Sequence, residues 1–170
     1  MTRCIAWILL AVFGLPVSAD PVHDLAAAIE ARLLLMPNVA RYKWNHDLTV
    51  TDPARESALL DHIGARAAAL DVDPACARIV VEAQLAASRG WQQRLFDRWR
   101  TKGRRSFQGV PDLATTVRPA IDDATERLLV ALRDVGCEAD PAVAARLDTA
   151  PHSLADVADV WAIAVSPWIE

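Results

Sequence analysis

The sequence has little of what metal, covalent and phosphate chemistry require. Its 170 residues contain three cysteines and four histidines, with no CxxC pair and no HExxH motif, so the sequence predicts no metal site. No serine lies in a nucleophile elbow, and the six glycines form no phosphate-binding loop. The sequence therefore argues against metal-dependent, serine-nucleophile and phosphate-loop chemistry.

Long apolar runs are also scarce, and the one that stands out lies at the N-terminus. Arg3 is followed by an apolar run over residues 5–15 and by small residues up to Ala19, which is the pattern of a cleavable signal peptide. The run is too short to span a bilayer, although a retained anchor is the alternative. We expect residues 1–19 to be removed and residues 20–170 to be a periplasmic or secreted protein without stable membrane insertion.

The chain has no excess of positive charge. Residues 20–170 carry 17 lysines and arginines against 22 aspartates and glutamates, a net charge of −5. This balance argues against nucleic acid as a partner. The length fits a single domain that buries about two-thirds of its unfolded surface, which is enough for a real core.

Two cysteines remain once the signal peptide, which contains Cys4, is removed. They are Cys76 and Cys137. An oxidising compartment favours a disulfide between them, and two independent buried thiols are the alternative.

The hydrophobic pattern predicts an all-α, single-domain bundle of about six helices. Four Asp-Pro pairs mark helix starts, because aspartate caps a helix and proline suits its first position. The one β-like stretch, residues 48–51, is interpreted as a connecting loop. The expected helices cover residues 22–46 with a kink or restart at Pro37, 52–70, 73–102 and 111–136, followed by two short helices opening at Asp140 and Ser153.

Polar residues interrupt two helical stripes that are otherwise apolar. Arg32 falls on the stripe of the first predicted helix, and Ser88 and Gln92 lie four apart on the stripe of the longest one. A buried charge costs several kcal/mol unless something pairs with it. These residues are therefore candidates for a buried polar site.

Two further cationic residues follow Arg32, and few carboxylates lie near them in the sequence. Lys43 follows eleven positions later, and Arg55 lies in the first turn of the next helix, where the backbone also favours anions. The only obvious nearby carboxylate is Glu56. We expect the missing anion to be a ligand, namely a small rigid dianion held by charge-assisted hydrogen bonds.

Two other interpretations of the same residues remain open. The chain may be read as an exported helical module that binds a small dicarboxylate without turnover. It may also be read as a structural or interaction protein whose cations are salt-bridged or reach the surface. The basic run over residues 94–105 is interpreted as the solvated end of a helix and not as a binding patch.

One pattern runs through most of the chain, namely Arg32…Arg41-Tyr42-Lys43-Trp44…Asp52-Pro53-Ala54-Arg55-Glu56…Gln84-x-x-x-Ser88-x-x-x-Gln92…Arg118. Its order and spacing resemble the all-helical, type II chorismate mutases, and in particular their secreted, single-domain subclass. The resemblance implies an isomerase that converts chorismate to prephenate by an intramolecular [3,3] (Claisen) rearrangement, without metal or cofactor, in phenylalanine and tyrosine biosynthesis. It also favours a homodimer with each site inside one subunit.

The resemblance also implies a role for each matching residue. Lys43, Gln92 and Arg55 would be the catalytic residues, with Lys43 and Gln92 donating to the ether oxygen of the breaking C–O bond. The substrate carboxylates would be held by Arg32, Arg55 and Arg118. Glu56 would accept from the ring hydroxyl, and Asp52 and Ser88 would add contacts around the substrate.

Two positions depart from the family pattern. Arg118 precedes Pro119, and this proline is expected to kink a helix that begins at Asp112. Leu59 lies one turn after Arg55, where some secreted relatives have a polar side chain, and Glu56 is expected to supply that contact.

Overall fold

The computed structural model describes residues 20–169, and every regular element within that range is helical. The all-α prediction is confirmed. The described chain has seven α-helices because the first predicted helix ends and restarts at Leu35, just before Pro37. The elements are α1 (Pro21–Leu34), α2 (Met36–Asn45), α3 (Pro53–Ala69), α4 (Pro74–Thr101), α5 (Arg118–Val135), α6 (Pro141–Leu147) and α7 (Ala158–Ile169), with a π-helical segment η1 (Leu113–Val117) and a 3₁₀ segment η2 (His152–Val157).

The four Asp-Pro pairs begin α1, α3, α4 and α6. In each pair the aspartate carboxylate accepts a backbone N–H from two or three residues ahead, and the proline occupies the first turn, where no N–H is needed. These caps therefore fix which residues fall in the first turn of each helix. The capping aspartates are Asp20, Asp52, Asp73 and Asp140.

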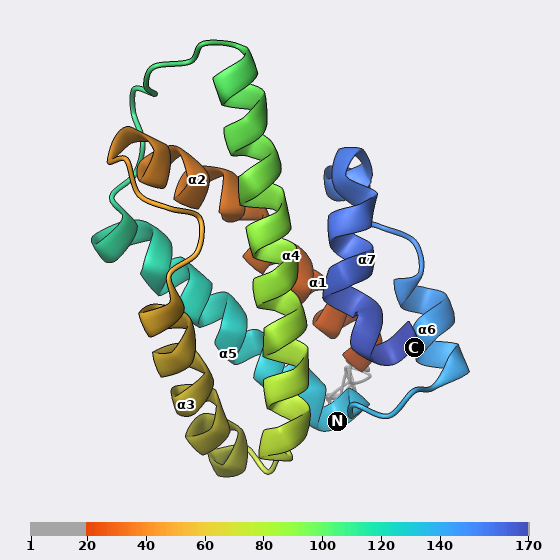
Figure 1. Cartoon of the computed structure of the whole chain (residues 1–170). Helices are drawn as coiled ribbons and strands as arrows, with labels where there is room; N and C mark the ends of the chain where they lie inside the picture. The colour runs from red at the N-terminus through yellow and green to blue at the C-terminus, as the bar shows by residue number, and fades with distance from the viewer. Residues whose placement is uncertain (1–19, 170) are drawn as a thin grey trace, which may run out of the picture.

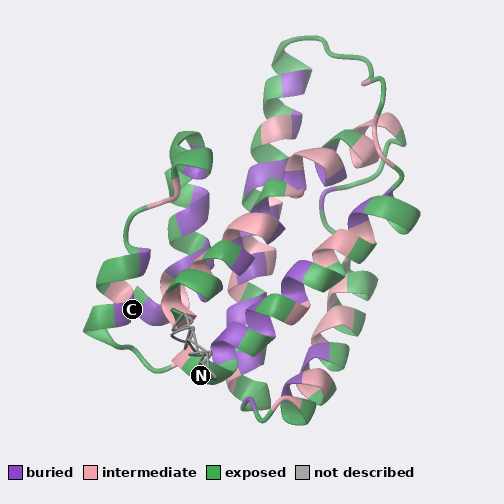
Figure 2. Cartoon of the chain, turned by 180° about the vertical axis from the view of Figure 1, so that it is seen from behind, coloured by how far each residue is buried: buried purple, intermediate pink, exposed green. Residues whose placement is uncertain are grey.

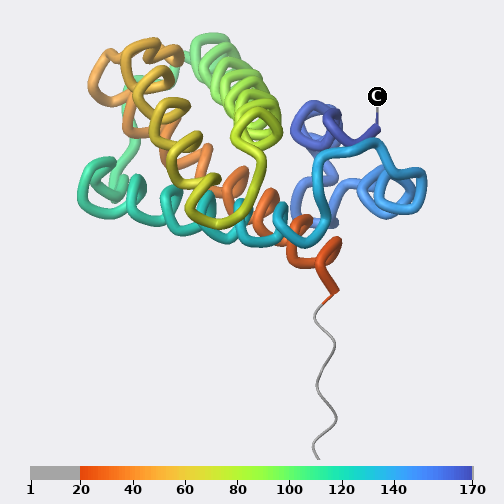
Figure 3. Tube along the Cα trace, turned by 90° about the horizontal axis from the view of Figure 1, so that it is seen from below, coloured from red at the N-terminus to blue at the C-terminus, as the bar shows by residue number. Residues whose placement is uncertain are grey.

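The helices form two packed layers. Helices α1 and α5 lie side by side in one layer, and α3, α4 and α7 form the other (Figure 3). The longest helix, α4, runs through the middle of the molecule with α3 on one side and α7 on the other (Figure 1). Helix α2 crosses the upper half of α4 and also contacts η1.

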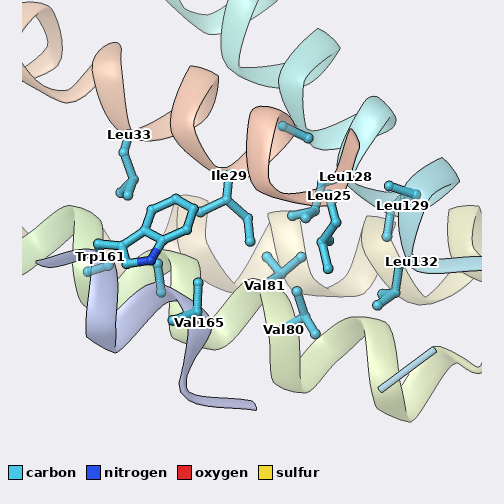
Figure 4. Close-up of a cluster of buried hydrophobic side chains, with 14 of the residues drawn as sticks. Leu25, Ile29, Leu33, Val80, Val81, Leu128, Leu129, Leu132, Trp161 and Val165 are labelled. Carbon is cyan, nitrogen blue, oxygen red and sulfur yellow. The ribbon is translucent and has the colours of Figure 1, made fainter. Parts of the chain in front are cut away.

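The main core lies where α1, α4, α5 and α7 meet. Figure 2 shows buried residues gathered between the helices and exposed residues along their outer faces. Burying one such large apolar side chain stabilises the fold by roughly 1.5–3 kcal/mol. The close-up in Figure 4 labels Leu25, Ile29 and Leu33 of α1, Val80 and Val81 of α4, Leu128, Leu129 and Leu132 of α5, and Trp161 and Val165 of α7.

A smaller aromatic cluster holds α2 against the end of α4. Trp44 packs edge-on against Phe96 with ring centroids 5.1 Å apart, and against Trp99 at 5.6 Å. Asn45 exchanges two hydrogen bonds with the backbone of Phe107, at 2.8 and 2.9 Å. These contacts tie the loop after α4 to α2 and so set where the chain enters η1.

A disulfide joins Cys76, at the start of α4, to Cys137, just after α5, and their Cα atoms lie 5.7 Å apart. This is the pairing favoured from the sequence. Gly136 precedes the bridge with a φ of +77°, a conformation that glycine adopts at little cost. The bridge therefore links the start of α4 in one layer to the end of α5 in the other layer.

The predicted signal peptide, residues 1–19, lies outside the described residues. Between residues 20 and 169, none of the helices has the length and apolarity that a membrane span needs.

Candidate active site

All eight residues predicted to form the site line one cavity of about 110 Å³. The cavity is enclosed by α1, α2, α3, α4 and the start of α5, together with Val50 of the loop before α3. The eight residues are Arg32, Lys43, Asp52, Arg55, Glu56, Ser88, Gln92 and Arg118.

Arg32 is the most deeply buried cation of the cavity, with 2% of its surface exposed. Its Nε donates to Thr125 Oγ1 and its Nη1 donates to Ser88 Oγ, both at 3.3 Å. The guanidinium therefore links α1 to α4 and α5. No ion pair within residues 20–169 includes it. Burial lowers the pKa of Arg32 to about 10, and the charge of Asp122 acts in the opposite direction, so Arg32 stays positive at neutral pH.

The two hydroxyls that accept hydrogen bonds from Arg32 donate their own protons to backbone carbonyls. Ser88 donates to the carbonyl of Gln84, and Thr125 donates to the carbonyl of Ile121, each at 2.7 Å. Only their lone pairs are left to face Arg32, which orients the guanidinium without neutralising it.

Lys43 is half-buried on α2 and donates from Nζ to the carbonyl of Val50. Burial lowers the pKa of Lys43, and the positive charge of Arg118 lowers it further, whereas Asp52 and Glu56 act to raise it. An ammonium has three N–H donors, so the bond to Val50 aims Lys43 while leaving two donors for a ligand.

Gln92 lies on the inner face of α4 with 4% of its surface exposed. Its Nε2 donates to the carbonyl of Ser88 at 3.1 Å and contacts Met36 Sδ at 3.6 Å. Its Oε1 is buried with no hydrogen-bond partner among the described residues. A thioether is a weak acceptor, so a ligand oxygen at this wall would compete well for the second amide proton.

The first turn of α3 supplies three further residues to the cavity. Asp52 caps the helix by accepting from the backbone N–H of Arg55 at 3.3 Å, and the Arg55 side chain is exposed at the rim. Glu56 follows in the same turn. Its carboxylate accepts from Nη1 of Arg89 at 2.6 Å, so its hydrogen-bonded partner is Arg89 and not one of the predicted cations.

Arg118 also reaches the cavity, and the predicted kink takes an unexpected form. The segment expected to be one helix from residue 111 begins as the π-helical η1, and Arg118 is the first residue of α5 with ordinary helical dihedrals. Proline has no N–H, and its ring crowds the carbonyl four positions earlier, so a wider turn before Pro119 relieves the conflict. Asp112 starts the turn by accepting from the N–H groups of Ala114 and Thr115.

Two charged residues of the cavity were missed from the sequence, Arg89 and Asp122. Each lies close to a predicted site residue, Arg89 directly after Ser88 and Asp122 one helical turn after Arg118. That proximity was the available signal. With both included, five cationic and three carboxylate side chains line the cavity, an excess of two positive charges. The fold and the cavity therefore define an all-helical domain with a small cavity whose lining carries an excess of positive charge.

Comparisons with known proteins identify the family. The sequence model of the family described as chorismate mutase type II matches residues 23–93. The chain is 28% identical to the secreted chorismate mutase of Mycobacterium tuberculosis, over 86% of this chain and 75% of that protein. It is 32% identical to the monofunctional chorismate mutase of Enterobacter agglomerans, over 71% of this chain and 66% of that protein. A crystal structure of chorismate mutase from Burkholderia thailandensis superposes with a TM-score of 0.74 at 34% identity, covering 87% of this chain and 98% of that one. The chain belongs to the chorismate mutase type II family.

Because Arg32 is buried without a carboxylate partner, replacing it with an apolar residue should not destabilise the fold. We expect Arg32→Met to leave the free energy of unfolding unchanged or to raise it by up to about 3 kcal/mol, since it removes a desolvated charge. The same variant should lose the rise in melting temperature that a small rigid dianion such as phthalate gives the unsubstituted protein. Chemical denaturation and thermal shift measure the two effects.

The control is Arg78→Met, which removes an exposed α4 arginine that pairs with Glu82 at 3.0 Å. This change should leave the phthalate response intact. A large loss of stability in Arg32→Met, with no effect of phthalate on either protein, would make Arg32 a structural ion and not part of an anion site.

Proposed function

We propose that this chain catalyses the rearrangement of chorismate to prephenate in the cation-lined cavity, as an isomerase of phenylalanine and tyrosine biosynthesis. The single observation that carries the proposal is the excess of two positive charges in the cavity of a type II chorismate mutase fold. Chorismate is a small molecule with two carboxylates, so its charge at neutral pH matches this excess.

The arginines would select the reactive conformer of the substrate. Arg32, Arg55 and Arg118 approach the cavity from α1, α3 and α5, so between them they can hold two carboxylates at separate points. Fixing both carboxylates would favour the folded substrate over its extended forms. In a unimolecular reaction this positioning contributes directly to the rate.

Lys43 and Gln92 would stabilise the negative charge that develops on the ether oxygen as the C–O bond breaks. Lys43 has two N–H groups beyond the one that it donates to Val50, and the second amide proton of Gln92 meets only the weak acceptor Met36 Sδ. Fixed donors of this kind stabilise a transition state without reorganising at the moment of reaction. The step needs no nucleophile and no proton transfer.

The remaining polar residues would complete the contacts around the ring. Glu56 has one carboxylate oxygen bonded to Arg89, so the other can accept from the ring hydroxyl. Ser88 would act through Arg32, to which it is hydrogen-bonded, and Asp52 through the first turn of α3, which it caps.

Purified residues 20–170 should convert chorismate to prephenate, and loss of either ether-oxygen donor should slow the conversion strongly. We expect Lys43→Ala and Gln92→Ala each to lower kcat by about 10²–10³, which is typical of removing one preorganised donor. The measurement is the disappearance of chorismate together with the appearance of prephenate.

Gln93→Ala is the matched control, because Gln93 is exposed beside Gln92 and bonds to Asp97. It should keep full activity. Tight binding of chorismate without turnover would instead make the chain a dicarboxylate-binding protein. A loss of less than about threefold in both alanine variants would remove the two donors from the mechanism.

The rate should fall at alkaline pH when Lys43 loses its proton. Because burial lowers the pKa of Lys43, the fall in kcat/KM should have its midpoint below the ordinary lysine value of 10.5. Lys43→Arg should abolish this alkaline fall in kcat/KM, because arginine keeps its charge. Gln92 does not titrate, so activity should need no acid, whereas Gln92→Glu should be active only where the buried carboxyl is protonated. A pH–rate profile unchanged by either substitution would contradict these roles.

We further propose that residues 1–19 are a signal peptide and that the enzyme works in the periplasm or outside the cell. The Cys76–Cys137 disulfide supports export, because such bridges persist in oxidising compartments, and one relative is named a secreted enzyme. Protein recovered from the periplasm should begin at Asp20 and expose no free thiol when denatured. Retention in the cytoplasm with two reduced thiols would contradict export.

We also propose a homodimer whose two sites are each complete within one subunit. All the residues assigned above belong to one chain and line one cavity, which supports an independent site. Sedimentation should give the mass of two chains, and specific activity should not change when dilution separates them.

A further inference from the structure

We propose that Arg89 is a positioning residue of this site. It holds the Glu56 carboxylate so that one oxygen faces the substrate hydroxyl and the group stays away from Lys43. This inference rests on the proposed function, because it assigns a partner to one of the residues of that site.

The geometry of the Arg89–Glu56 pair is specific. Nη1 of Arg89 lies 2.6 Å from Oε2 of Glu56, which is a short, charge-assisted hydrogen bond across the space between α4 and α3. Both side chains line the cavity. Ser88, whose hydroxyl accepts from Arg32, lines the same cavity. The pair is therefore part of the cavity wall.

The pair matters because Glu56 has a competing cation nearby. The charge of Glu56 acts on Lys43, which lines the same cavity. A carboxylate free to rotate would be drawn to that ammonium and would occupy the donors intended for the ether oxygen. Arg89 binds one oxygen of Glu56, so the second is left to accept from the substrate and Lys43 remains available.

The charge of Arg89 also matters to the cavity as a whole. Without it the lining would have four cations against three carboxylates, an excess of only one positive charge. The substrate is a dianion, so Arg89 completes the charge match while its bond to Glu56 keeps it from competing for the substrate carboxylates.

A purely structural role does not explain the pair well. The side chains are 37% and 22% exposed, and ion pairs with this access to water contribute little to stability. Removing Arg89 should therefore change the melting temperature by no more than about 3 °C. Its main effect should fall on the reaction.

The test is a double-mutant cycle of Arg89→Met and Glu56→Gln, with kcat and KM for chorismate measured on the full mature chain. We expect Arg89→Met alone to lower kcat/KM about 10- to 100-fold, mostly through kcat, since Glu56 and Lys43 would lose their working geometry. In the Glu56→Gln background the same substitution should cost less than about threefold, because the carboxylate to be positioned is already gone. Arg89→Lys should restore most of the activity.

Arg78→Met is the matched control, since it removes an arginine of the same helix that pairs with Glu82 away from the cavity. It should leave kcat/KM unchanged. Equal losses from Arg89→Met in both backgrounds would mean that Arg89 contacts the substrate directly, and a loss of stability without a kinetic loss would make it structural. Either result overturns the inference. Absence of turnover by the unsubstituted chain would instead overturn the proposed function.

Discussion

A buried guanidinium that has no ion-pair partner among residues 20–169 is the constraint on which the rest of this structure depends. Arg32 lies at the junction of α1, α4 and α5, and within that range its hydrogen bonds go to the hydroxyls of Ser88 and Thr125. Such a charge is unfavourable in an interior, and the apolar core around it must supply the compensating stability. A bound anion would therefore interact favourably with the buried positive charge of Arg32. Lys43 adds a second cation to the same cavity, and Gln92 adds a neutral donor.

Helix starts determine how the other charged groups reach the cavity. The cap at Asp52 puts Arg55 and Glu56 in the first turn of α3, where both line the cavity, and the π-helical turn before Pro119 lets Arg118 begin α5 at the cavity wall. A helix cap or a π-helical turn involves only neighbouring residues. Together, however, these features bring charges from distant parts of the chain into one site. The position of the site therefore depends on where the helices begin as much as on how they pack.

The sequence was sufficient to predict the helices and eight of the polar or charged residues that line the cavity, for physical reasons that particular residues make clear. Arg32 and Gln92 were detectable because they break apolar stripes, and the Asp-Pro starts because their chemistry is local. Arg118 was assigned only through the family resemblance, and the π-helical form of its approach was not foreseen. Arg89 was missed because its partner Glu56 is 33 residues away, and a pairing across two helices leaves no periodic signal.

The cavity also shows how the proposed rearrangement, which needs no nucleophile and no proton transfer, could be accelerated by fixed hydrogen-bond donors. Each donor makes one hydrogen bond to a backbone carbonyl, Lys43 to that of Val50 and Gln92 to that of Ser88. These bonds hold the two groups in place. Both residues line a small space with an excess of positive charge. In the proposed mechanism the donors are already fixed, so a developing negative charge would meet them without reorganisation, and this is the difference between binding an anion and accelerating its formation. A looser set of the same residues would bind a dianion but would stabilise its ground state as much as its transition state.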